Sequence, residues 1–354
     1  MRNCFSFYTD VKDIIKVGIS NELLTDGDAI CRMVKNREWG ILWLFGRNVS
    51  LDLMKPSDIV DSRILFSALD WGWGHVSRGI GLLDEMAANR NDLFIACNQA
   101  QRDVFELYFP SVTFIDHDGY DFNFRGKGNF TLDMLRNYKR LKKRQKKELS
   151  EVDEYINKHK IDYVISDHRY AFRSKDKPSF FITHQLNLPV KWWQKSVQLK
   201  HQNLMTEFTS VWVPDTEDQL YSGKLSNDIE GLEIEYMGPK SRFSRYSTTP
   251  EKNGPPVIIA SGPTVYAQQL VDEFVLKYPK AIVICEEGLS IPQGHERISG
   301  NWLDQDSAII ESSFVVSRSG YSTIMDLVLL GTPHELIPTP GQAEQIFLSK
   351  RIRD

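Results

Sequence analysis

The chain has few cysteines, no long apolar run and no excess of basic charge. Its 354 residues include 4 cysteines, and none forms a C-x-x-C pair, so reduced thiols in a cytoplasm are the simplest interpretation. The histidines show no spacing typical of metal ligands, and no metal is expected. No apolar stretch approaches the about 20 residues that span a bilayer, and no signal core starts the chain. The formal net charge of -4 excludes a global basic field for nucleic acid.

Short apolar segments alternate with amphipathic or charged ones from Arg63 onward. The segments are often apolar throughout, as in strands that are covered on both faces of a parallel sheet. This alternation indicates βαβ units and therefore the α/β fold class. The expected strands are Ile64–Leu69, Leu93–Ala96, Val112–Ile115, Tyr163–Ser166, Phe180–Thr183, Val211–Val213, Val257–Ser261, Ile282–Cys285, Phe314–Val316 and Glu335–Ile337.

Two halves are expected, because a segment rich in Pro, Gly, Ser and Thr interrupts the alternation at Met237–Pro256. We expect an N-terminal Rossmann-like domain over residues 62–240, a linker over 241–255 and a C-terminal Rossmann-like domain over 256–354. A cleft between two such domains is a common place for a ligand.

Residues 1–61 fit neither half, although Asp28–Val34 could form a short helix. An appended N-terminal extension is the simpler interpretation, with Met54 as an alternative start codon. A small accessory subdomain is the other interpretation.

The first expected strand runs into a glycine-rich turn, Asp70–Gly79. Gly72 and Gly74 allow the backbone to turn tightly and to approach a ligand closely. A helical pattern begins near His75, so free N–H groups and the positive end of the helix dipole favour an anion there. His75 could accept a proton near neutral pH or donate to a phosphate. A tight turn with a capping histidine is the structural alternative, and Ser77 breaks the dinucleotide pattern G-x-G-x-x-G.

Two further turns of small residues follow strands in the second half. Ser261 and Gly262 lie at the end of an expected strand, where α/β sheets bind ligands, although a plain loop is the alternative. The segment Ser317–Thr323 leads into the helix Ile324–Leu330, and Pro338–Gln345 closes the block. Hydroxyls and amides at a helix N-terminus make a cradle for phosphate.

Three side chains of this block could contact a nucleotide sugar. Asp326, one turn into the helix, could accept hydrogen bonds from ribose hydroxyls, and Gln342 and Gln345 could reach the sugar. For each residue alone, capping or a solvated helix face is an equally ordinary role.

Together these blocks resemble the GT-B glycosyltransferases, and specifically the family 28-like branch that includes the bacterial N-acetylglucosaminyltransferase making lipid II. The resemblance rests on Gly72–Arg78, Ser317–Leu327 and Pro338–Gln345. An uncharacterised bacterial subgroup is similar through Ile165–Tyr170 and Phe181–Gln185. The similarity covers the chain from the first expected strand to its end.

The resemblance implies two Rossmann-like domains with parallel sheets, a cleft between them and no metal or other cofactor. It implies a nucleotide-sugar donor, usually a UDP-sugar, on the C-terminal half and an acceptor on the N-terminal half. Asp326 matches the ribose-binding acid, Ser322 and Thr323 match diphosphate contacts, and Gln345 matches a sugar contact. The expected donor-binding residues are Gly74, Ser261, Gly262, Arg318, Ser319, Gly320, Ser322, Thr323, Asp326, Gln342 and Gln345. The expected acceptor-side residues are Trp73, Arg78, Asp167, Arg169, His184 and Gln185.

The sequence departs from the family in two places. Glu335 stands where related chains usually carry an apolar strand residue. The chain also stops at Asp354, whereas family members continue into a helix that crosses back to the N-terminal domain. A truncated C-terminal domain with exposed apolar surface is therefore expected.

Glycosyl transfer from a diphosphate needs stabilised charge on the leaving phosphate and a base for the acceptor hydroxyl. Without a metal, the two helix N-termini must supply the stabilisation, and domain closure would exclude water. His75 is the expected base or diphosphate contact, with Asp70 as a second catalytic candidate and Asp167 and His184 as rivals. The expected outcome is inverting transfer of a sugar, such as N-acetylglucosamine, to a glycan or lipid-linked acceptor of the cell envelope.

Two other functions stay open. A nucleotide-sugar hydrolase or epimerase would use the same fold with water, or nothing, in place of the acceptor. A catalytically inactive sugar-nucleotide-binding protein would fit a truncated chain.

A basic segment, Arg136–Lys147, precedes the acidic segment Glu148–Glu154. A solvated helix with i,i+4 charge pairs is the simplest interpretation. The alternative is peripheral contact with anionic lipid at the inner face of the membrane, which suits a lipid-linked acceptor. Lys191–Lys195 pairs two tryptophans with lysines, as at a bilayer interface, a sugar-stacking wall or a buried core.

Overall fold

The computed structural model describes residues 54–120, 130–190, 195–246 and 251–352. The short helix expected at Asp28–Val34 and the tryptophans of Lys191–Lys195 lie outside the described residues. Contacts divide the chain into the units Met1–Asn48 and Val49–Asp354. Both sheets lie in the second unit.

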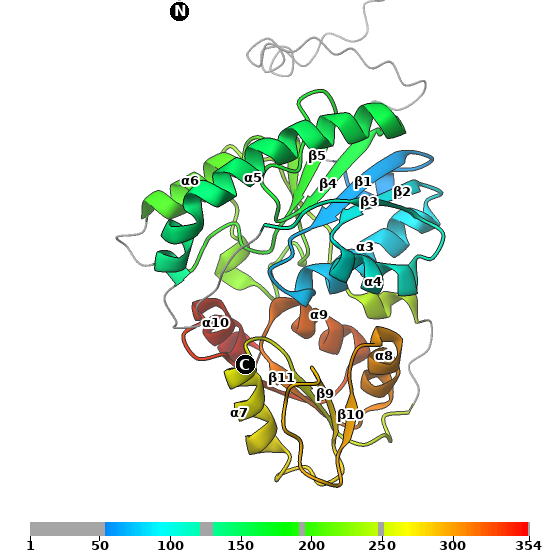
Figure 1. Cartoon of the computed structure of the whole chain (residues 1–354). Coiled ribbons are helices and arrows are strands. Elements are labelled where there is room, and N and C mark those ends of the chain that lie inside the picture. Colours follow the sequence, from blue (N-terminus) through cyan, green and yellow to red (C-terminus); the bar gives the residue numbers. More distant parts are fainter. Residues whose placement is uncertain (1–53, 121–129, 191–194, 247–250, 353–354) are drawn as a thin grey trace, which may run out of the picture. The chain divides into compact units, whose positions relative to one another are not determined.

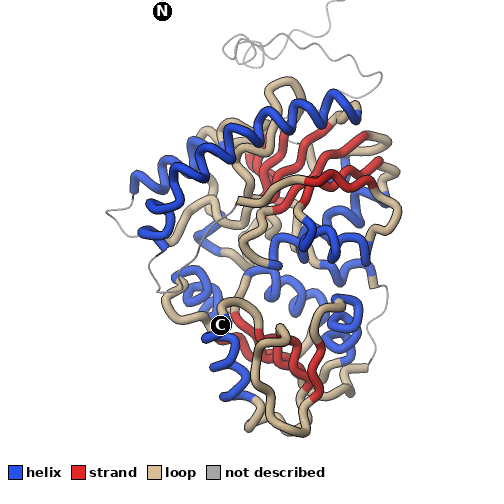
Figure 2. Tube along the Cα trace, viewed as in Figure 1, coloured by secondary structure: helices blue, strands red, loops and turns tan. Residues whose placement is uncertain are grey.

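The strands form two separate parallel sheets (Figure 2). The N-terminal sheet has seven strands in the order β3-β2-β1-β4-β5-β6-β7. They are β1 (Arg63–Ala68), β2 (Asp92–Cys97), β3 (Thr113–Asp116), β4 (Tyr163–Asp167), β5 (Ser179–Ile182), β6 (Ser210–Val213) and β7 (Ile234–Tyr236). The C-terminal sheet has five strands in the order β10-β9-β8-β11-β12. They are β8 (Val257–Ala260), β9 (Ile282–Cys285), β10 (Glu296–Ile298), β11 (Val315–Arg318) and β12 (His334–Ile337). We call the parts built on these sheets the N-lobe and the C-lobe.

Helices connect the parallel strands in both lobes (Figure 1). Those of the N-lobe are α3 (Trp73–Ala88), α4 (Gln99–Tyr108), α5 (Phe130–His159) and α6 (Lys195–Met205). Those of the C-lobe are α7 (Thr264–Phe274), α8 (Trp302–Glu311), α9 (Tyr321–Leu330) and α10 (Ala343–Arg351). Short 3-10 helices are η2 (Pro56–Asp58), η4 (Gly223–Ser226) and η5 (Arg242–Arg245).

The N-lobe sheet is buried on both faces, which explains why its strands lack alternation. Ile64 and Phe66 of β1 pack in one core with α3 and α4, whereas Leu65 packs with Val152 of α5 in another. Successive side chains of a strand point to opposite faces, so an apolar strand supplies both cores.

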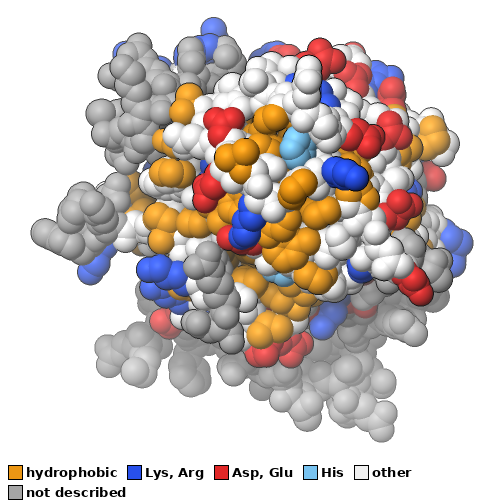
Figure 3. All heavy atoms as spheres, turned by 90° about the horizontal axis from the view of Figure 1, so that it is seen from below, with side chains coloured by type: hydrophobic (Ala, Val, Ile, Leu, Met, Phe, Trp, Pro, Cys, Tyr) orange, Lys and Arg blue, Asp and Glu red, His pale blue; other side chains and the backbone are white. Residues whose placement is uncertain are grey.

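The C-lobe sheet is likewise covered on both faces. Val257 and Val315 share a core with α8, α9 and α10, whereas Ile258 and Val316 share a core with α7. Figure 3 views this end of the molecule and shows hydrophobic side chains gathered at its centre with charged ones around them. Leu276, two residues after the end of α7, is 83% exposed.

The expected two-sheet α/β architecture is confirmed, and each of the ten expected strands overlaps an observed one. Two strands were not expected, Ile234–Tyr236 and Glu296–Ile298. Both have three residues, include charged side chains and lie at a sheet edge, where one side of the strand is unpaired. Their apolar signal is therefore too short to separate from a loop.

The segments expected as extension and linker contribute packing contacts. Met54 accepts a hydrogen bond on its carbonyl oxygen from the Trp212 indole at 2.8 Å, and Ile59 is buried in the N-lobe core. Within the expected linker, η5 packs against both α3 and α9.

Candidate active site

Polar side chains gather at the carboxyl edge of the N-lobe sheet. Asp70 follows β1, Asp167 ends β4 and His184 follows β5. These three strands are neighbours, and parallel strands end at the same edge. His75 joins them from the first turn of α3, which begins at Trp73, two residues earlier than expected.

His75, Asp167 and Arg78 form one hydrogen-bonded group. His75 Nδ1 lies 2.9 Å from Asp167 Oδ1 and 2.8 Å from an Arg78 NH2 nitrogen. Arg78 Nε donates to Asp167 Oδ2 at 2.7 Å, and its NH2 group donates to Asp167 Oδ1. The spacing of three residues along α3 places His75 and Arg78 on the same face of the helix. A carboxylate held on the Nδ1 side leaves His75 Nε2 directed elsewhere, where it could accept a proton.

Burial and charge define the ionisation of this group. Asp167 is fully buried, and burial alone would raise its pKa. The positive charge of Arg78 and the His75 ring instead lower the pKa of Asp167 well below its usual value. Asp167 is therefore a carboxylate at neutral pH, while His75 keeps a side chain that is 20% exposed.

His184 links the two lobes. Its Nδ1 lies 3.2 Å from an Arg78 NH1 nitrogen, and its Nε2 lies 2.7 Å from Glu344 Oε1 on α10. Its ring stacks on Tyr321, the first residue of α9, with centroids 3.9 Å apart and planes 3° apart. Burial lowers the pKa of His184, although Glu344 opposes this, so the neutral imidazole is favoured.

The N-termini of α3 and α9 meet at this place. Ser322, in the first turn of α9, donates a hydrogen bond to the Gly74 carbonyl oxygen at 2.7 Å. A Cβ atom on Gly74 would lie 3.0 Å from Ser322 Oγ, so glycine permits the close approach. Beside them, the Trp73 ring meets Trp302 of α8 edge to face at 5.6 Å. Two helix ends with free N–H groups thus face one region.

Asp326 is buried in a network that involves both lobes. Ser241 donates to its Oδ1 at 2.6 Å, and Arg242 NH1 donates to its Oδ2 at 2.7 Å. Ser77 of α3 donates to Oδ2 at 3.2 Å. Arg242 Nε also donates to Asp306 of α8 at 2.5 Å. Burial raises the pKa of Asp326, and Arg242 opposes that shift.

The other expected donor-binding residues lie at the carboxyl edge of the C-lobe sheet. Ser261 and Gly262 follow β8 and are exposed, and Gln342 is exposed before α10. Ser319 donates to the Gln345 carbonyl oxygen at 2.9 Å, and Gln345 Oε1 accepts from the Thr339 amide at 2.8 Å. The remaining members of this set are Arg318, which donates to the carbonyl oxygens of Tyr266 and Pro338, Gly320, which caps α9, and Thr323, which lies in its first turn.

Asp70 and Arg169 belong to a neighbouring cluster. Arg169 is 1% exposed, its Nε donates to Glu148 Oε1 at 2.7 Å, and its NH1 lies 4.0 Å from Asp70 Oδ1. Asp70 accepts a hydrogen bond from the Tyr120 amide at 3.1 Å. Burial raises the pKa of Glu148, but Arg169 and His117 lower it below its usual value. Gln185, the last acceptor-side residue expected, has its side-chain nitrogen 3.3 Å from His184 Nε2.

Several residues of this region carry no clear signal of their role in the sequence. Glu344 lies directly before Gln345, in a block that was recognised, so its position was a usable signal. Arg242 lies in a segment whose composition predicts a linker, and only the positions of Asp306 and Asp326 on two other helices suggest that it has buried partners. Glu148 lies in a helix rich in charged residues, and the composition of such a helix does not show which of its charged side chains is buried.

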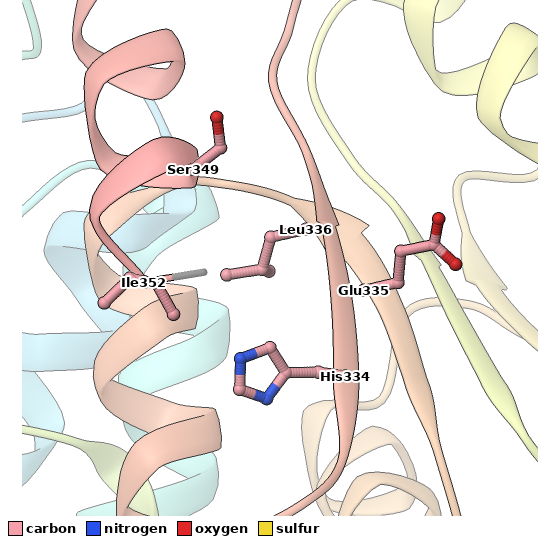
Figure 4. A pocket seen from close by; sticks show the side chains of 5 residues that line it. All are labelled: His334, Glu335, Leu336, Ser349 and Ile352. Carbon is pink, nitrogen blue, oxygen red and sulfur yellow. The ribbon is translucent and has the colours of Figure 1, made fainter. Parts of the chain in front are cut away.

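A cavity of about 190 Å³ lies elsewhere in the C-lobe, between β12 and α10, and shares no residue with the site. Figure 4 shows His334 and Leu336 pointing towards Ile352, whereas Glu335 points to the opposite side of β12. Glu335 accepts a hydrogen bond from Lys277 Nζ at 2.7 Å. The charged residue at a position expected to be apolar is thus explained by this ion pair.

Within residues 54–120, 130–190, 195–246 and 251–352, no three His, Cys, Asp or Glu side chains converge as metal ligands. No helix in this part of the chain has both the length and the apolar character needed to cross a membrane.

Comparison with known proteins identifies the fold. The glycosyltransferase family 28 C-terminal domain matches residues 300–347, which hold α8, β11, α9, β12 and the beginning of α10. A search of curated proteins gives no significant match. Among solved structures, the spinosyn rhamnosyltransferase SpnG superposes with a TM-score of 0.55 at 14% identity, over 82% of this chain and 84% of its own. The glycotransferase of kitacinnamycin gives 0.53 at 12% identity, over 81% and 84%. SsfS6 from Streptomyces sp. SF2575, complexed with thymidine diphosphate, gives 0.51 at 16% identity, over 82% and 85%.

The chain has the GT-B fold. Together with the family 28 match, this makes it a glycosyltransferase of the GT-B type, similar to family 28. The resemblance inferred from Gly72–Arg78 and Ser317–Leu327 is thereby confirmed for fold and enzyme class. The individual residue roles, the donor and the acceptor stay predictions.

Proposed function

We propose that this GT-B glycosyltransferase transfers a sugar from a nucleoside diphosphate, with inversion, to a hydroxyl group of a glycan or lipid-linked acceptor. The observation that carries the proposal is the His75–Asp167 pair, which lies at the N-terminus of α3 where the N-terminus of α9 also arrives. A proton acceptor and two anion-favouring helix ends are what transfer from a diphosphate requires.

In the proposed step, His75 Nε2 takes the proton of the acceptor hydroxyl. The acceptor oxygen forms a bond to the anomeric carbon as the bond from that carbon to the diphosphate oxygen breaks. Attack from the face opposite the leaving group inverts the anomeric centre. Asp167 accepts a hydrogen bond from the His75 Nδ1–H group and so favours the tautomer with a free Nε2 lone pair.

The departing diphosphate gains negative charge, which the first turns of α3 and α9 would stabilise with backbone N–H groups. Ser322 and Thr323 would add hydroxyl donors, as expected from the resemblance. For the nucleoside, ribose hydroxyls would replace the Ser241 and Ser77 hydroxyls on Asp326. We propose UDP as the carrier and N-acetylglucosamine as one candidate sugar; SsfS6 and SpnG, in contrast, are both known in complexes with thymidine diphosphate.

The base assignment is tested by measuring UDP release from UDP-N-acetylglucosamine, with and without a panel of sugar acceptors. His75→Ala should reduce turnover by about 10²–10⁴, the usual contribution of a general base. His295→Ala is the matched control, since His295 lies in the C-lobe and contacts the Ala281 carbonyl oxygen. Turnover of His75→Ala within about twofold of the unchanged protein would refute the assignment. Equal UDP release without any acceptor would favour a hydrolase instead.

A lipid-linked acceptor would require a membrane-facing surface, and α5 with α6 offers one. Along α5, Lys139, Lys142, Lys143 and Lys146 are exposed and spaced to share one face. Tyr138 is 41% exposed, and Lys200 of α6 lies 4.9 Å from its ring centroid, which places the two helices side by side (Figure 1). We propose that this face contacts anionic lipid at the inner leaflet.

Flotation with phosphatidylcholine vesicles that contain phosphatidylserine tests this surface. The unchanged protein should float at low salt, and the variant Lys142→Glu with Lys143→Glu should not, because each basic residue contributes about 1 kcal/mol near such a surface. Lys350→Glu on α10 is the control with one charge reversed in the C-lobe. Absence of binding by the unchanged protein at low salt would remove the membrane proposal and leave a soluble glycan as the acceptor.

A further inference from the structure

The polar groups around His75 form a continuous chain that ends in the other lobe. From the C-lobe, Glu344 bonds to His184, which lies next to Arg78. Arg78 bonds to Asp167, and both lie against His75 Nδ1. In this series of bonded groups, the side chains of Asp167, Arg78 and His184 are at most 8% exposed, whereas the end groups His75 and Glu344 are 20% and 30% exposed.

The protonation of His184 follows from its partners. An arginine only donates, so His184 Nδ1 must accept from Arg78 and its proton must sit on Nε2. That proton is donated to the Glu344 carboxylate. Burial lowers the pKa of His184 and keeps the ring neutral, as this arrangement requires. Glu344 therefore selects the tautomer of His184 that can hold Arg78.

The position of Arg78 affects which tautomer of His75 is favoured. His75 Nδ1 has two neighbours at nearly the same distance, Asp167 Oδ1 at 2.9 Å and an Arg78 nitrogen at 2.8 Å. If Nδ1 carries a proton, it donates to Asp167, and Nε2 is free to act as a base. If Arg78 donates to Nδ1, the proton sits on Nε2, and Nε2 then has no free lone pair with which to accept the proton of the acceptor hydroxyl.

We propose that Glu344 and His184 are positioning residues that anchor Arg78 across the two lobes and thereby hold His75 in its base-competent tautomer. The anchor directs one end of the Arg78 guanidinium to His184 and holds its other end in two bonds to Asp167, so that Asp167 Oδ1 stays beside His75 Nδ1 as the acceptor of the Nδ1–H hydrogen bond. Glu344 belongs to α10 of the C-lobe and His184 to the N-lobe. His75 is therefore held in its base-competent tautomer only when the two lobes are in contact. This proposal rests on the role of His75 proposed above.

Nitrogen-15 NMR of histidine-labelled protein tests the proposal without any substrate. The ring signals of His75 are assigned with His75→Gln and report the ratio of its two neutral tautomers. Glu344→Ala and His184→Phe should each shift that ratio towards Nε2–H by about tenfold, the effect of one good hydrogen bond. His184→Phe keeps an aromatic ring to stack on Tyr321, so a change in it reports the lost nitrogens and not the lost stacking.

Two control variants separate positioning from a general structural effect. Glu344→Gln keeps an oxygen that accepts from His184 Nε2 and should keep the ratio within about twofold. Glu287→Gln changes an exposed C-lobe carboxylate and should leave the spectrum of His75 unchanged. A ratio for His75 that stays within twofold in both Glu344→Ala and His184→Phe would overturn the proposal. Full turnover in His75→Ala would instead overturn the proposed function, whatever the tautomer ratio.

Discussion

At the scale of single residues, the site depends on buried charges that are each paired with a specific partner. Asp167 and Arg78 show this most clearly, since both side chains are at most 4% exposed. A buried charge is tolerated only when its partner and its hydrogen bonds are present. Changes that remove one partner should therefore affect stability as well as catalysis.

Asp167→Asn tests the pairing of this carboxylate. The amide keeps the shape of the side chain but leaves the Arg78 guanidinium buried without a countercharge. We expect a loss of about 3 kcal/mol in the free energy of unfolding at pH 7, as for other buried pairs that lose one partner. Urea unfolding followed by circular dichroism measures it, and a loss below about 0.5 kcal/mol would contradict the pairing.

The difference in stability between the unchanged protein and Asp167→Asn should depend on pH in a defined direction. Ion pairing lowers the pKa of Asp167 in the folded protein, so its stabilisation is present above the unfolded value of about 3.9 and is lost as pH falls towards the folded value. The stability difference between the unchanged protein and Asp167→Asn should stay constant from pH 7 to about pH 5 and shrink below pH 4. Thermal unfolding across this range measures it, and a difference that grows with acid would be the wrong sign.

At the scale of elements, the close contact of α3 with η5 fixes the helix that carries His75. A Cβ atom on Gly81 would lie 2.3 Å from the Ser241 carbonyl oxygen, where no side chain fits. The glycine therefore lets the two backbones touch, and the same segment supplies Ser241 and Arg242 to Asp326.

Gly81→Ala should push η5 away from α3 and destabilise the protein by about 1–3 kcal/mol, the usual cost of overpacking. Gly288→Ala is the matched control, because a Cβ atom there would meet nothing within 4 Å; we expect it to change stability by less than about 0.5 kcal/mol. Chemical denaturation of both variants checks the difference. Equal stability of the two would show that α3 and η5 are not in this contact.

The elements show how much of the fold could be predicted from sequence. The two sheets could be predicted from short segments that are apolar throughout and are each followed by a turn. A strand that is buried on both faces has apolar side chains at successive positions, which is easy to recognise in the sequence. His75, Asp167 and His184 could be expected at one edge, because parallel strands end together. The roles of Glu344 and Arg242 as partners could not be deduced. Their bonds depend on how the two lobes pack against each other, and the local sequence does not show which residues of the two lobes come close together.

At the scale of the whole molecule, a few buried polar contacts join the lobes. Arg242 is the centre of one group, since it bonds to Ser77 of the N-lobe and to Asp306 and Asp326 of the C-lobe. The other group contains the Glu344–His184 and Ser322–Gly74 bonds. The proposed binding of a donor ribose to Asp326 would therefore require rearrangement of the first group.

Arg242→Met should test that group. It leaves Asp306 and Asp326 buried without a cation, and we expect a loss of about 3–5 kcal/mol at pH 7. Without Arg242 the pKa of Asp326, which burial already raises, should rise further, so part of this loss should be recovered as pH falls towards 5 and Asp326 takes up a proton. Arg245→Met in the same 3-10 helix is the control, because Arg245 is partly exposed and should contribute about 1 kcal/mol or less. Unfolding curves at pH 7 and pH 5 measure both, and a loss for Arg242→Met that deepens at pH 5 would contradict this account.

The most direct test of the account is a thermal-shift comparison of UDP, GDP, dTDP and CDP with the full chain. A nucleoside diphosphate held between the N-termini of α3 and α9 at 100 times its dissociation constant should stabilise the folded protein by about 2.7 kcal/mol. We expect UDP to raise Tm more than the other three nucleotides. If none of the four raised Tm at millimolar concentration, no nucleotide-sugar site would exist between these helices, and the account would be wrong.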